Sequence, residues 1–394
     1  MKPAARVQSA IELLDEIIVS AREAGPPADA IIQSFFQRRR YAGSGDRRAI
    51  REFVYRAIRR TGERPVSGRA AMLGVGQDDP ETLALFDWSL RAPVPPVEGE
   101  PVSEASTLPA WIVPHLDPLI EGGEVEALLE RAPLDLRVNL LKGDREAALA
   151  ALPEATPTGH SPIGLRLPEG FALQTHEAWT SGLVEVQDEG SQLVSLACAA
   201  RPGMNVLDLC AGAGGKTLAL AADMANRGRI VASDVDRRRL AQLPPRAERA
   251  GATNITTHLL NPRREAEALQ AVRGKMGLVL VDAPCSGSGT WRRNPETRWR
   301  LTDARLEQVV ALQAYLLDLA AELVRPGGHL VYAVCSILAP EGREQVQRFA
   351  ERHSDFVLEE PDIQAGRPCG QGRMLTPAHD GTDGFFFARW QAPC

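Results

Sequence analysis

The stretch VLVDAPC (residues 279–285) is a short apolar run that ends at a cysteine, and HLVYAVCS (residues 329–336) repeats this arrangement further along the chain. Both runs are rich in valine and leucine and follow a glycine closely, which is typical of buried strands in a parallel sheet. Such sheets bind ligands beyond the carboxyl ends of their strands. Neighbouring strands lie about 4.8 Å apart. If these two strands are neighbours, Cys285 and Cys335 could share one active site, which would favour covalent chemistry over packing.

Strands and helices alternate through the C-terminal half of the chain. This alternation predicts an α/β fold built on a doubly wound, Rossmann-like parallel sheet. We expect its strands at 205–209, 229–233, 255–260, 278–281 and 329–334, and its helices at 217–226, 237–250 and 303–324.

The N-terminal part of the chain has a different pattern. Apolar residues recur at helical spacing from residue 5 to residue 91, which predicts helices throughout. A proline-rich stretch follows, typical of an extended linker, and then a mixture of short helical and extended segments. We therefore expect an all-α domain at 1–92, a linker at 93–106, a small α/β subdomain at 107–175 and the large α/β domain at 176–394.

Composition narrows the class of protein. A chain of 394 residues is too long for one ordinary core. No apolar stretch approaches the roughly 20 residues that a membrane helix needs, and the N-terminus lacks the pattern of a signal peptide. The six cysteines include no Cys-x-x-Cys pair, which argues against a zinc site or a disulfide scaffold. We expect a cytoplasmic monomer with neither a metal nor a membrane partner.

The charge distribution allows a nucleic-acid partner although the net charge is −6. Residues 38–64 contain ten arginines against Asp46, Glu52 and Glu63, a local balance of +7. A basic segment in an acidic protein is a possible phosphate-binding face. A solvated helix surface would have the same composition.

The first expected strand of the large domain runs into DLCAGAGGKT (residues 208–217), a glycine-rich turn before a helix. Such a turn lets a ligand approach the backbone closely. A phosphate-binding Walker loop would need glycine where Cys210 stands, and a dinucleotide fingerprint would need glycine or alanine where Thr217 stands. S-adenosylmethionine has no pyrophosphate and needs only the tight turn. Asp234, at the end of the second strand, is placed to bind ribose hydroxyls in either of the last two cases.

Two thiols, a carboxylate and an S-adenosylmethionine pocket suit methylation at carbon 5 of a pyrimidine. A thiolate that adds to carbon 6 makes carbon 5 nucleophilic enough to take the methyl group. The carboxyl of Asp282 could polarise the N3/N4 edge of a cytosine, and the base must be extruded or single-stranded. Amino methylation is disfavoured because the turn at 282–285 reads Asp-Ala-Pro-Cys rather than Asn/Asp-Pro-Pro-aromatic.

Residues 184–394 resemble the catalytic domain of the RsmB/Nop/Sun family of RNA cytosine-5 methyltransferases. The stretches that carry the resemblance are 186–192 (VQDEGSQ), 210–217, 282–287, 334–336 and 383–386 (DGFF). The resemblance implies that Cys335 is the nucleophile and that Cys285 assists product release. It implies that Asp282 and Lys216 contact the target cytosine. The presence of both cysteines favours RNA, because DNA cytosine methyltransferases use a Pro-Cys after the fourth strand as nucleophile.

The family pattern also implies where the cofactor is held. The positions that match are Cys210, Ala211, Gly212, Ala213, Gly214, Gly215, Lys216, Asp234, Arg239, Asn261 and Asp282. Three positions depart from the usual residues: Asn261 replaces an aspartate, Ala213 a proline and Val334 a threonine. In the family pattern, the adenine contact belongs to the aspartate that Asn261 replaces.

The rest of the chain resembles RNA-binding parts of the same family. The helical N-terminal region is similar to a NusB-like RNA-binding domain, and the module around 136–139 is similar to the family's small RNA-binding subdomain. Arginines interleaved with Trp291 and Trp299 suit phosphate binding and base stacking, although Trp299 could instead pack a loop. The candidate RNA-binding residues are Arg38, Arg39, Arg40, Arg47, Arg48, Arg137, Asn139, Arg292, Arg293 and Arg298.

The resemblance implies a bacterial-type enzyme acting on 16S ribosomal RNA. Two alternatives stay open at this point. One is the same chemistry on transfer RNA, and the other is a non-catalytic RNA-binding or ribosome assembly factor that keeps the fold.

Overall fold

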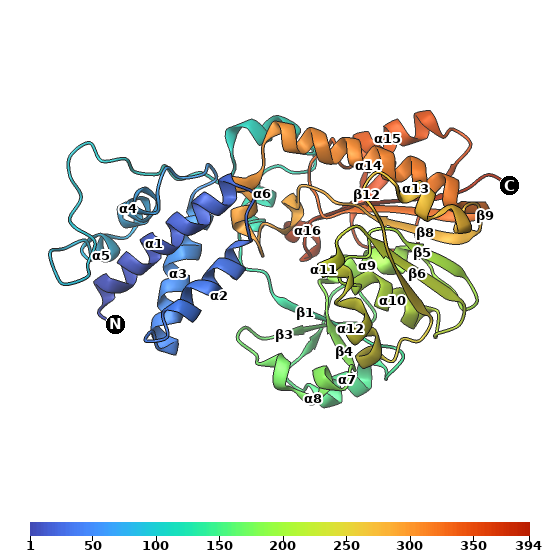
Figure 1. The fold of residues 1–394 in the computed structure, drawn as a ribbon, viewed down its shortest axis with the longest axis horizontal. Helices are drawn as coiled ribbons and strands as arrows, with labels where there is room; N and C mark the ends of the chain where they lie inside the picture. The colour runs from blue at the N-terminus through green and yellow to red at the C-terminus, as the bar shows by residue number, and fades with distance from the viewer. The chain divides into compact units, whose positions relative to one another are not determined.

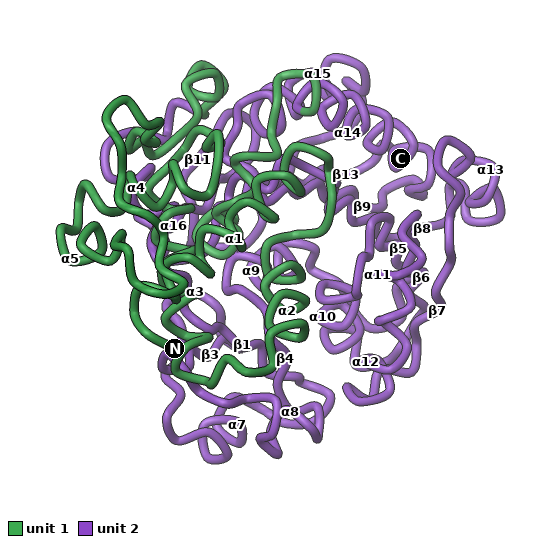
Figure 2. The backbone as a smooth tube through the Cα atoms, turned by 60° about the vertical axis from the view of Figure 1, so that its left-hand side comes forward, with its two compact units in different colours: residues 1–116, 290–305 green, residues 117–289, 306–394 purple.

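The computed structural model describes all 394 residues and divides them into two compact units (Figure 2). Unit 1 comprises Met1–Leu116 and Thr290–Arg305, and unit 2 comprises Asp117–Gly289 and Leu306–Cys394. The stretch expected to be a linker, residues 93–106, therefore belongs to unit 1. So do residues 290–305, which the sequence pattern assigned to the catalytic domain.

Unit 1 is all-α, as expected. Its helices are α1 (Pro3–Arg22), α2 (Ala28–Arg38), α3 (Ser44–Arg60), α4 (Gly68–Asp78) and α5 (Pro80–Leu83), with 3-10 turns η1 (Ala110–His115) and η5 (Pro295–Arg300). Local signals explain several boundaries. Pro3 occupies the first turn of α1, where its missing N–H costs nothing, and the Ser67 side chain caps α4 by accepting from the Ala70 amide.

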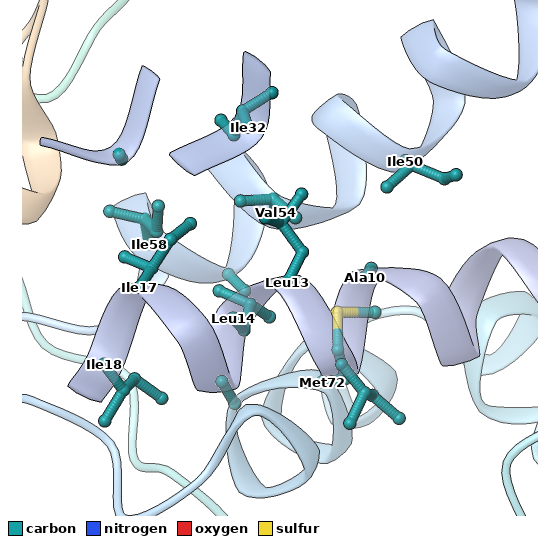
Figure 3. Close-up of a cluster of buried hydrophobic side chains, with 14 of the residues drawn as sticks. Ala10, Leu13, Leu14, Ile17, Ile18, Ile32, Ile50, Val54, Ile58 and Met72 are labelled. Carbon is teal, nitrogen blue, oxygen red and sulfur yellow. The ribbon is translucent and has the colours of Figure 1, made fainter. Parts of the chain in front are cut away.

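The core of unit 1 lies between α1 and its neighbouring helices (Figure 3). Leu13, Leu14 and Ile17 of α1 are fully buried, and Val54 of α3 and Met72 of α4 belong to the same cluster. Trp299, from η5, completes this core at 2% exposure, and its Nε1 donates to the carbonyl of Thr61 at 2.8 Å. The indole therefore ties residues 290–305 to unit 1.

Unit 2 contains the predicted parallel sheet (Figure 1). Five neighbouring strands run parallel in the order β7-β6-β5-β8-β9. Their bounds are β5 (Asn205–Asp208), β6 (Arg229–Asp234), β7 (Ile255–Leu259), β8 (Met276–Asp282) and β9 (Val324–Val334). All five strands predicted from the sequence are thereby confirmed, and with them the α/β fold class.

The sheet continues past β9 with antiparallel strands that the sequence pattern did not predict. β13 (Phe385–Gln391) pairs with β9, and the remaining strands are β12 (Gly372–Leu375), β11 (Arg367–Cys369) and β10 (Val357–Glu359). The sheet is therefore mixed, with one antiparallel edge.

Helices cover both faces of this sheet, with α9 and α10 on one face and α14 and α15 on the other (Figure 1). The helices of this domain are α9 (Glu189–Ala197), α10 (Gly215–Asp223), α11 (Arg237–Leu240), α12 (Leu243–Ala250), α13 (Glu265–Ala268), α14 (Asp303–Leu323), α15 (Arg343–Arg352) and α16 (Pro377–Asp380), with 3-10 turns η3 (Gln270–Val272) and η4 (Ser288–Thr290). The single helix expected at 237–250 is two helices. Pro244 and Pro245 explain the break, because they lack the N–H groups a continuous helix would use and instead fit the first turn of α12.

A second, four-stranded antiparallel sheet forms the small α/β module of unit 2. Its strand order is β2-β3-β1-β4, with β1 (Leu134–Val138), β2 (Thr156–Pro157), β3 (Gly164–Leu167) and β4 (Val184–Val186). The accompanying helices are α7 (Arg145–Ala151), α8 (Glu177–Thr180) and the 3-10 turn η2 (Leu173–Thr175). The short helix α6 (Gly123–Ala127), expected within this module, instead packs on the large domain, where Glu124 pairs with Arg367 of β11. The module extends beyond residue 175, because β4 pairs with β1. No helix in the chain combines the length and apolarity needed to span a lipid bilayer.

Strand order locates the binding crevice. From β5 the chain proceeds to β6 on one side, while β8 lies on the other side of β5. In doubly wound sheets ligands bind beyond the carboxyl ends of strands at such a switch in direction. The glycine-rich turn follows the end of β5, and Asp282 is the last residue of β8.

Candidate active site

The two cysteines at the strand ends lie side by side. β8 and β9 are parallel neighbours with Asp282 opposite Ala333, and the Sγ atoms of Cys285 and Cys335 are 3.3 Å apart. Backbone hydrogen bonds join the two turns, from the Ala283 amide to the Ala333 carbonyl at 2.9 Å and from the Gly289 amide to the Cys335 carbonyl at 3.0 Å. The expectation that the two strands are neighbours and bring both thiols to one place is confirmed.

The electrostatic environment of Cys285 favours its protonated form. The hydrogen bond with Cys335 and burial, followed by the charges of Cys335 and Glu341, raise the pKa of the Cys285 thiol well above its usual value. Cys285 is therefore suited to donate a hydrogen bond to the sulfur of Cys335.

Lys216 and Asp282 form an ion pair at the same strand ends. The Lys216 Nζ lies 2.7 Å from Asp282 Oδ2, and Lys216 is 8% exposed. Burial opposes the charge on Lys216, but the Asp282 carboxylate outweighs it and raises the pKa of the ammonium, with a smaller contribution from Cys335. Lys216 thus remains a cation within electrostatic reach of Cys335. The structure brings the four predicted catalytic residues, Cys335, Cys285, Asp282 and Lys216, to the ends of β8 and β9 and the start of α10.

The glycine-rich turn joins β5 to α10 through backbone that favours glycine. Gly212 and Gly214 have φ values of +55° and +85°, which side chains with a Cβ rarely adopt. The Gly212 amide donates to Asp234 Oδ2 at 2.7 Å, and Arg246 donates to the Ala213 carbonyl at 2.6 Å. The turn is therefore fixed from both sides before any ligand binds.

Asp208, at the end of β5, is a functional candidate that sequence reasoning missed. Its side chain is buried, and Oδ2 accepts from the Thr217 hydroxyl at 2.6 Å, whereas Oδ1 has no hydrogen-bond partner. Burial raises the pKa of this carboxyl to about 7. A buried acceptor without a partner beside a glycine-rich turn fits a ligand with a positively charged donor, such as the ammonium of S-adenosylmethionine. The signal was present, since Asp208 ends a buried strand directly before the turn.

The other predicted cofactor residues surround this turn. The guanidinium of exposed Arg239 lies where a side chain at Gly212 would be. Asn261 is exposed and follows β7. Burial raises the pKa of the Cys210 thiol well above its usual value, so this third cysteine of the region is not an ionised nucleophile. The ligand contacts of these residues stay predictions.

Two of the stretches that carry the family resemblance meet beside Lys216. The Asp383 amide donates to both carboxylate oxygens of Asp188, at 3.1 and 3.2 Å. The Lys216 Nζ lies 5.2 Å from the centre of the Phe385 ring. The segments around 186–192 and 383–386 therefore form one wall beside the Lys216–Asp282 pair.

Three predicted RNA-binding residues have structural roles instead. Arg137, Asn139 and Arg298 are each 1% exposed. Arg137 donates to Gln187 Oε1, Asn139 to the carbonyls of Gly182 and Ala250, and Arg298 to the carbonyls of Pro295, Thr107 and Ile58. All three side chains are buried and hydrogen-bond within the protein, although Arg137 Nη1 has no partner, so the prediction of RNA contact was wrong for these three residues in this structure.

The expected stacking surface around Trp291 and Trp299 is also absent. Both indoles and the side chain of Arg292 are buried. Trp299 packs into the unit 1 core, as the alternative interpretation proposed. Arg293 is half-buried.

The N-terminal arginines divide into two groups. Arg38 and Arg39 pair with Glu16 and Glu12 of α1, at 2.7 and 2.6 Å, and Arg47 donates to the Ala42 carbonyl. Arg40 and Arg48 are exposed. Part of the predicted basic face is thus neutralised by α1, and the RNA-binding role of the remaining arginines stays a prediction.

Comparison with known protein sequences points to one family of methyltransferases. The family model described as 16S rRNA methyltransferase RsmB/F matches residues 195–391. The ribosomal RNA small subunit methyltransferase B of Salmonella paratyphi B is 33% identical to this chain over 288 residues. That alignment covers 71% of this chain and 65% of the relative, so the chain spans slightly less than two thirds of the relative's length.

Two solved structures have a similar fold. The protein PH0851 matches with a TM-score of 0.76 at 23% identity, over 98% of both chains. A methyltransferase homologue from Pyrococcus horikoshii matches with a TM-score of 0.60 at 29% identity, over 68% of this chain and 89% of that one. The first match extends the likeness of fold beyond the α/β domain to nearly the whole chain.

Proposed function

Because this chain belongs to the RsmB/F family of methyltransferases, we propose that it transfers a methyl group from S-adenosylmethionine to carbon 5 of a cytosine in small-subunit ribosomal RNA. The observation that carries this proposal is the pair of thiols 3.3 Å apart at the ends of β8 and β9, beside the Lys216–Asp282 ion pair. A site built only for cofactor binding would need neither thiol. A ribosomal RNA substrate implies a cytoplasmic protein.

The turn at 210–216, with Asp208, Asp234, Arg239 and Asn261, is proposed to hold S-adenosylmethionine. The unpartnered Oδ1 of Asp208 supports this assignment. The cofactor, when bound, supplies the methyl group.

Cys335 is proposed to begin the reaction as a thiolate. Its sulfur forms a bond to carbon 6 of the cytosine, and the displaced electron pair makes carbon 5 a nucleophile that takes the methyl group. A base then removes the proton from carbon 5, and the bond between sulfur and carbon 6 breaks to release the methylated base. The Lys216 ammonium lies within electrostatic reach of the Cys335 sulfur.

Cys285 is proposed to help the last step. It holds its proton because its pKa is raised, and its sulfur lies against that of Cys335. A thiol in this position donates a hydrogen bond to the leaving thiolate. Asp282 is proposed to bind the N3/N4 edge of the cytosine, with Lys216 holding its carboxyl group in place.

The test uses small ribosomal subunits and RNA from cells that lack this gene, with S-adenosylmethionine labelled in the methyl group. We expect label in 16S rRNA with the wild-type chain and none with Cys335→Ala, which should still bind the cofactor. Cys285→Ala should leave an enzyme–RNA adduct that survives a denaturing gel, because release is slowed. The control is Cys394→Ala, which changes an exposed cysteine.

Activity of Cys335→Ala equal to that of the wild type would refute the assignment of the nucleophile. Label only in transfer RNA would refute the ribosomal substrate, and label in no RNA would favour a non-catalytic factor. Absence of a stable adduct with Cys285→Ala would remove the release role of this thiol.

A further inference from the structure

One buried carboxylate joins the turns that carry the two cysteines. Glu341 lies between β9 and α15 and is completely buried. Its Oε1 accepts from the Ser286 amide at 2.8 Å, and its Oε2 accepts from the hydroxyls of Ser286 and Ser336. Ser286 directly follows Cys285, and Ser336 directly follows Cys335. The same carboxylate therefore binds the residue after each cysteine.

A glutamine from α14 extends this contact to the other side of Cys285. The Nε2 of Gln313 donates to Glu341 Oε1 at 2.9 Å and to the Pro284 carbonyl at 2.9 Å. The residues before and after Cys285 are thus both fixed with respect to Glu341. The Tyr332 hydroxyl donates to the Glu341 carbonyl at 2.8 Å, which fixes the backbone of Glu341 to β9 itself.

The serines near the carboxylate also lie close to one another, and Ser288 can donate to Ser336, since the Ser286 and Ser336 protons are already donated to Glu341. Ser286 Oγ lies 3.2 Å from Ser336 Oγ, and Ser288 Oγ lies 3.0 Å from Ser336 Oγ. The four donors to the Glu341 side chain are neutral groups, so the network satisfies the carboxylate while leaving its negative charge close to Cys285. That charge is one of the causes that raise the pKa of the Cys285 thiol.

We propose that Glu341 is a positioning residue, which holds the turns after β8 and β9 together so that the thiols of Cys285 and Cys335 face each other. The inference rests on the proposed function for its effect on turnover, but the geometry can be tested without it. Glu341 acts through Ser286 and Ser336 and contacts neither thiol in this structure. Loss of one well-placed acceptor releases both turns at once, since hydroxyls that now converge on one oxygen would need new partners.

The first experiment compares Glu341→Gln with the wild type in the methyl-transfer reaction. We expect kcat to fall by about 100-fold, the order of loss seen when reacting groups are misplaced by about 1 Å. The KM for RNA and the affinity for S-adenosylmethionine should change by less than about twofold, because Glu341 lies behind the cysteines rather than at the cofactor turn. Glu265→Gln is the matched control. Glu265 is also a buried glutamate, but its carboxylate accepts from the Tyr315 hydroxyl and binds neither Ser286 nor Ser336.

The second experiment measures alkylation of Cys285 by iodoacetamide as a function of pH, with the modified peptide quantified by mass spectrometry. Glu341→Gln removes a negative charge, so the midpoint for Cys285 should move to lower pH. Glu341→Asp keeps the charge but shortens the side chain. Glu341→Asp should therefore leave the alkylation midpoint of Cys285 near that of the wild type, while its kcat should be well below the wild-type kcat. A residue that merely stabilises the fold would not separate these two effects.

The outcomes distinguish this inference from the proposed function. If the wild type methylates RNA and Glu341→Gln does so at the same rate, the positioning role is refuted. If the wild type methylates no RNA, the proposed function fails, and the rate at which an added oxidant joins Cys285 and Cys335 in a disulfide then tests the geometry by itself, because the two sulfurs must face each other; an equal rate in Glu341→Gln and the wild type refutes the inference separately. Should Glu341→Gln not fold, Ser336→Ala removes one donor to the carboxylate and is expected to lower kcat in the same direction. Full activity of Ser336→Ala would then contradict the proposal.

Discussion

At the scale of single residues, the most unusual group is the carboxyl of Asp208. It is buried at the end of β5 with one oxygen unpartnered, and burial raises its pKa to about 7. In the unfolded chain an aspartate ionises near pH 4. Between pH 4 and pH 7, Asp208 is therefore mostly ionised in the unfolded chain and mostly protonated in the folded protein.

This difference predicts how stability changes with pH. A carboxyl whose pKa is raised by folding stabilises the protein below pH 4, and that stabilisation is lost as pH rises through about 7. Asp208→Asn cannot ionise and should lose this part of the pH dependence. The unfolding free energy of the variant relative to the wild type should therefore rise between pH 5 and pH 8 by about 2–3 kcal/mol, the part of a shift of about three pKa units that falls within this window.

Urea unfolding at several pH values measures this difference. Asp355→Asn is the control, because Asp355 is exposed. An unfolding free-energy difference between Asp208→Asn and the wild type that stays constant over this range would show that Asp208 is already ionised in the folded protein.

Residues at strand ends could be predicted from the sequence, and residues within polar networks could not. Cys285, Cys335 and Asp282 follow apolar runs whose direction fixes their place. Glu341 carries no such signal, because its importance depends on serines from two turns that only the fold brings together. Arg137 and Arg298 were misread for a related reason, since arginine composition does not show whether the guanidinium is buried and donates to the protein itself, to the Gln187 side chain for Arg137 and to backbone carbonyls for Arg298.

At the scale of elements, the turn between β5 and α10 depends on one conformation. Gly214 is the N-cap residue of α10 with φ of +85°, and a side chain there would collide with Leu243 of α12. Gly215, the next residue, has no atom within reach of an added Cβ and no positive φ. The two adjacent glycines thus differ in what they tolerate.

Gly214→Ala should accordingly destabilise the protein, by at least about 1–2 kcal/mol for the left-handed backbone alone, and should weaken S-adenosylmethionine binding. Gly215→Ala should change the unfolding free energy much less, because alanine suits the first turn of a helix. Urea unfolding and equilibrium dialysis with labelled cofactor measure both effects. Equal behaviour of the two variants would contradict the strained geometry of the turn.

Strands were predictable where they alternate with recognisable helices; β13 has seven residues but no helix longer than one turn directly before it, and it was missed. The five parallel strands are apolar runs next to recognisable helices and were confirmed. The short strands β10, β11 and β12 have only three or four residues, too few to show an alternation. They form because β13 offers a partner to β10 and β12, and β12 in turn pairs with β11. The break between α11 and α12 could have been read from Pro244 and Pro245.

At the scale of the whole molecule, the boundary of unit 1 is set by packing and not by chain order. Residues 290–305 join unit 1 through Trp299, which is 2% exposed within its core. A tryptophan between arginines is compatible with an RNA surface and with a core, and only the position of α1 and α3 decides between them.

Trp299→Ala should therefore reduce stability sharply, by about 3–5 kcal/mol as for other buried aromatic truncations. Trp88→Ala is the matched control, because Trp88 is 83% exposed and its loss should change the unfolding free energy by less than about 0.5 kcal/mol. Urea unfolding, followed by circular dichroism, measures both. A stability loss for Trp299→Ala no larger than that for Trp88→Ala would mean that the indole is not part of the core.

Because residues 290–305 belong to unit 1, they limit how this protein can be shortened. A fragment beginning at Asp117 would keep Cys285, Cys335 and the cofactor turn, yet it would expose the indole of Trp299 and strip Arg298 of the Thr107 and Ile58 carbonyls. A minimal catalytic fragment would need two deletions, the second replaced by a short polar bridge from Gly289 to Leu306. Fragments designed by removing the N-terminus alone should aggregate.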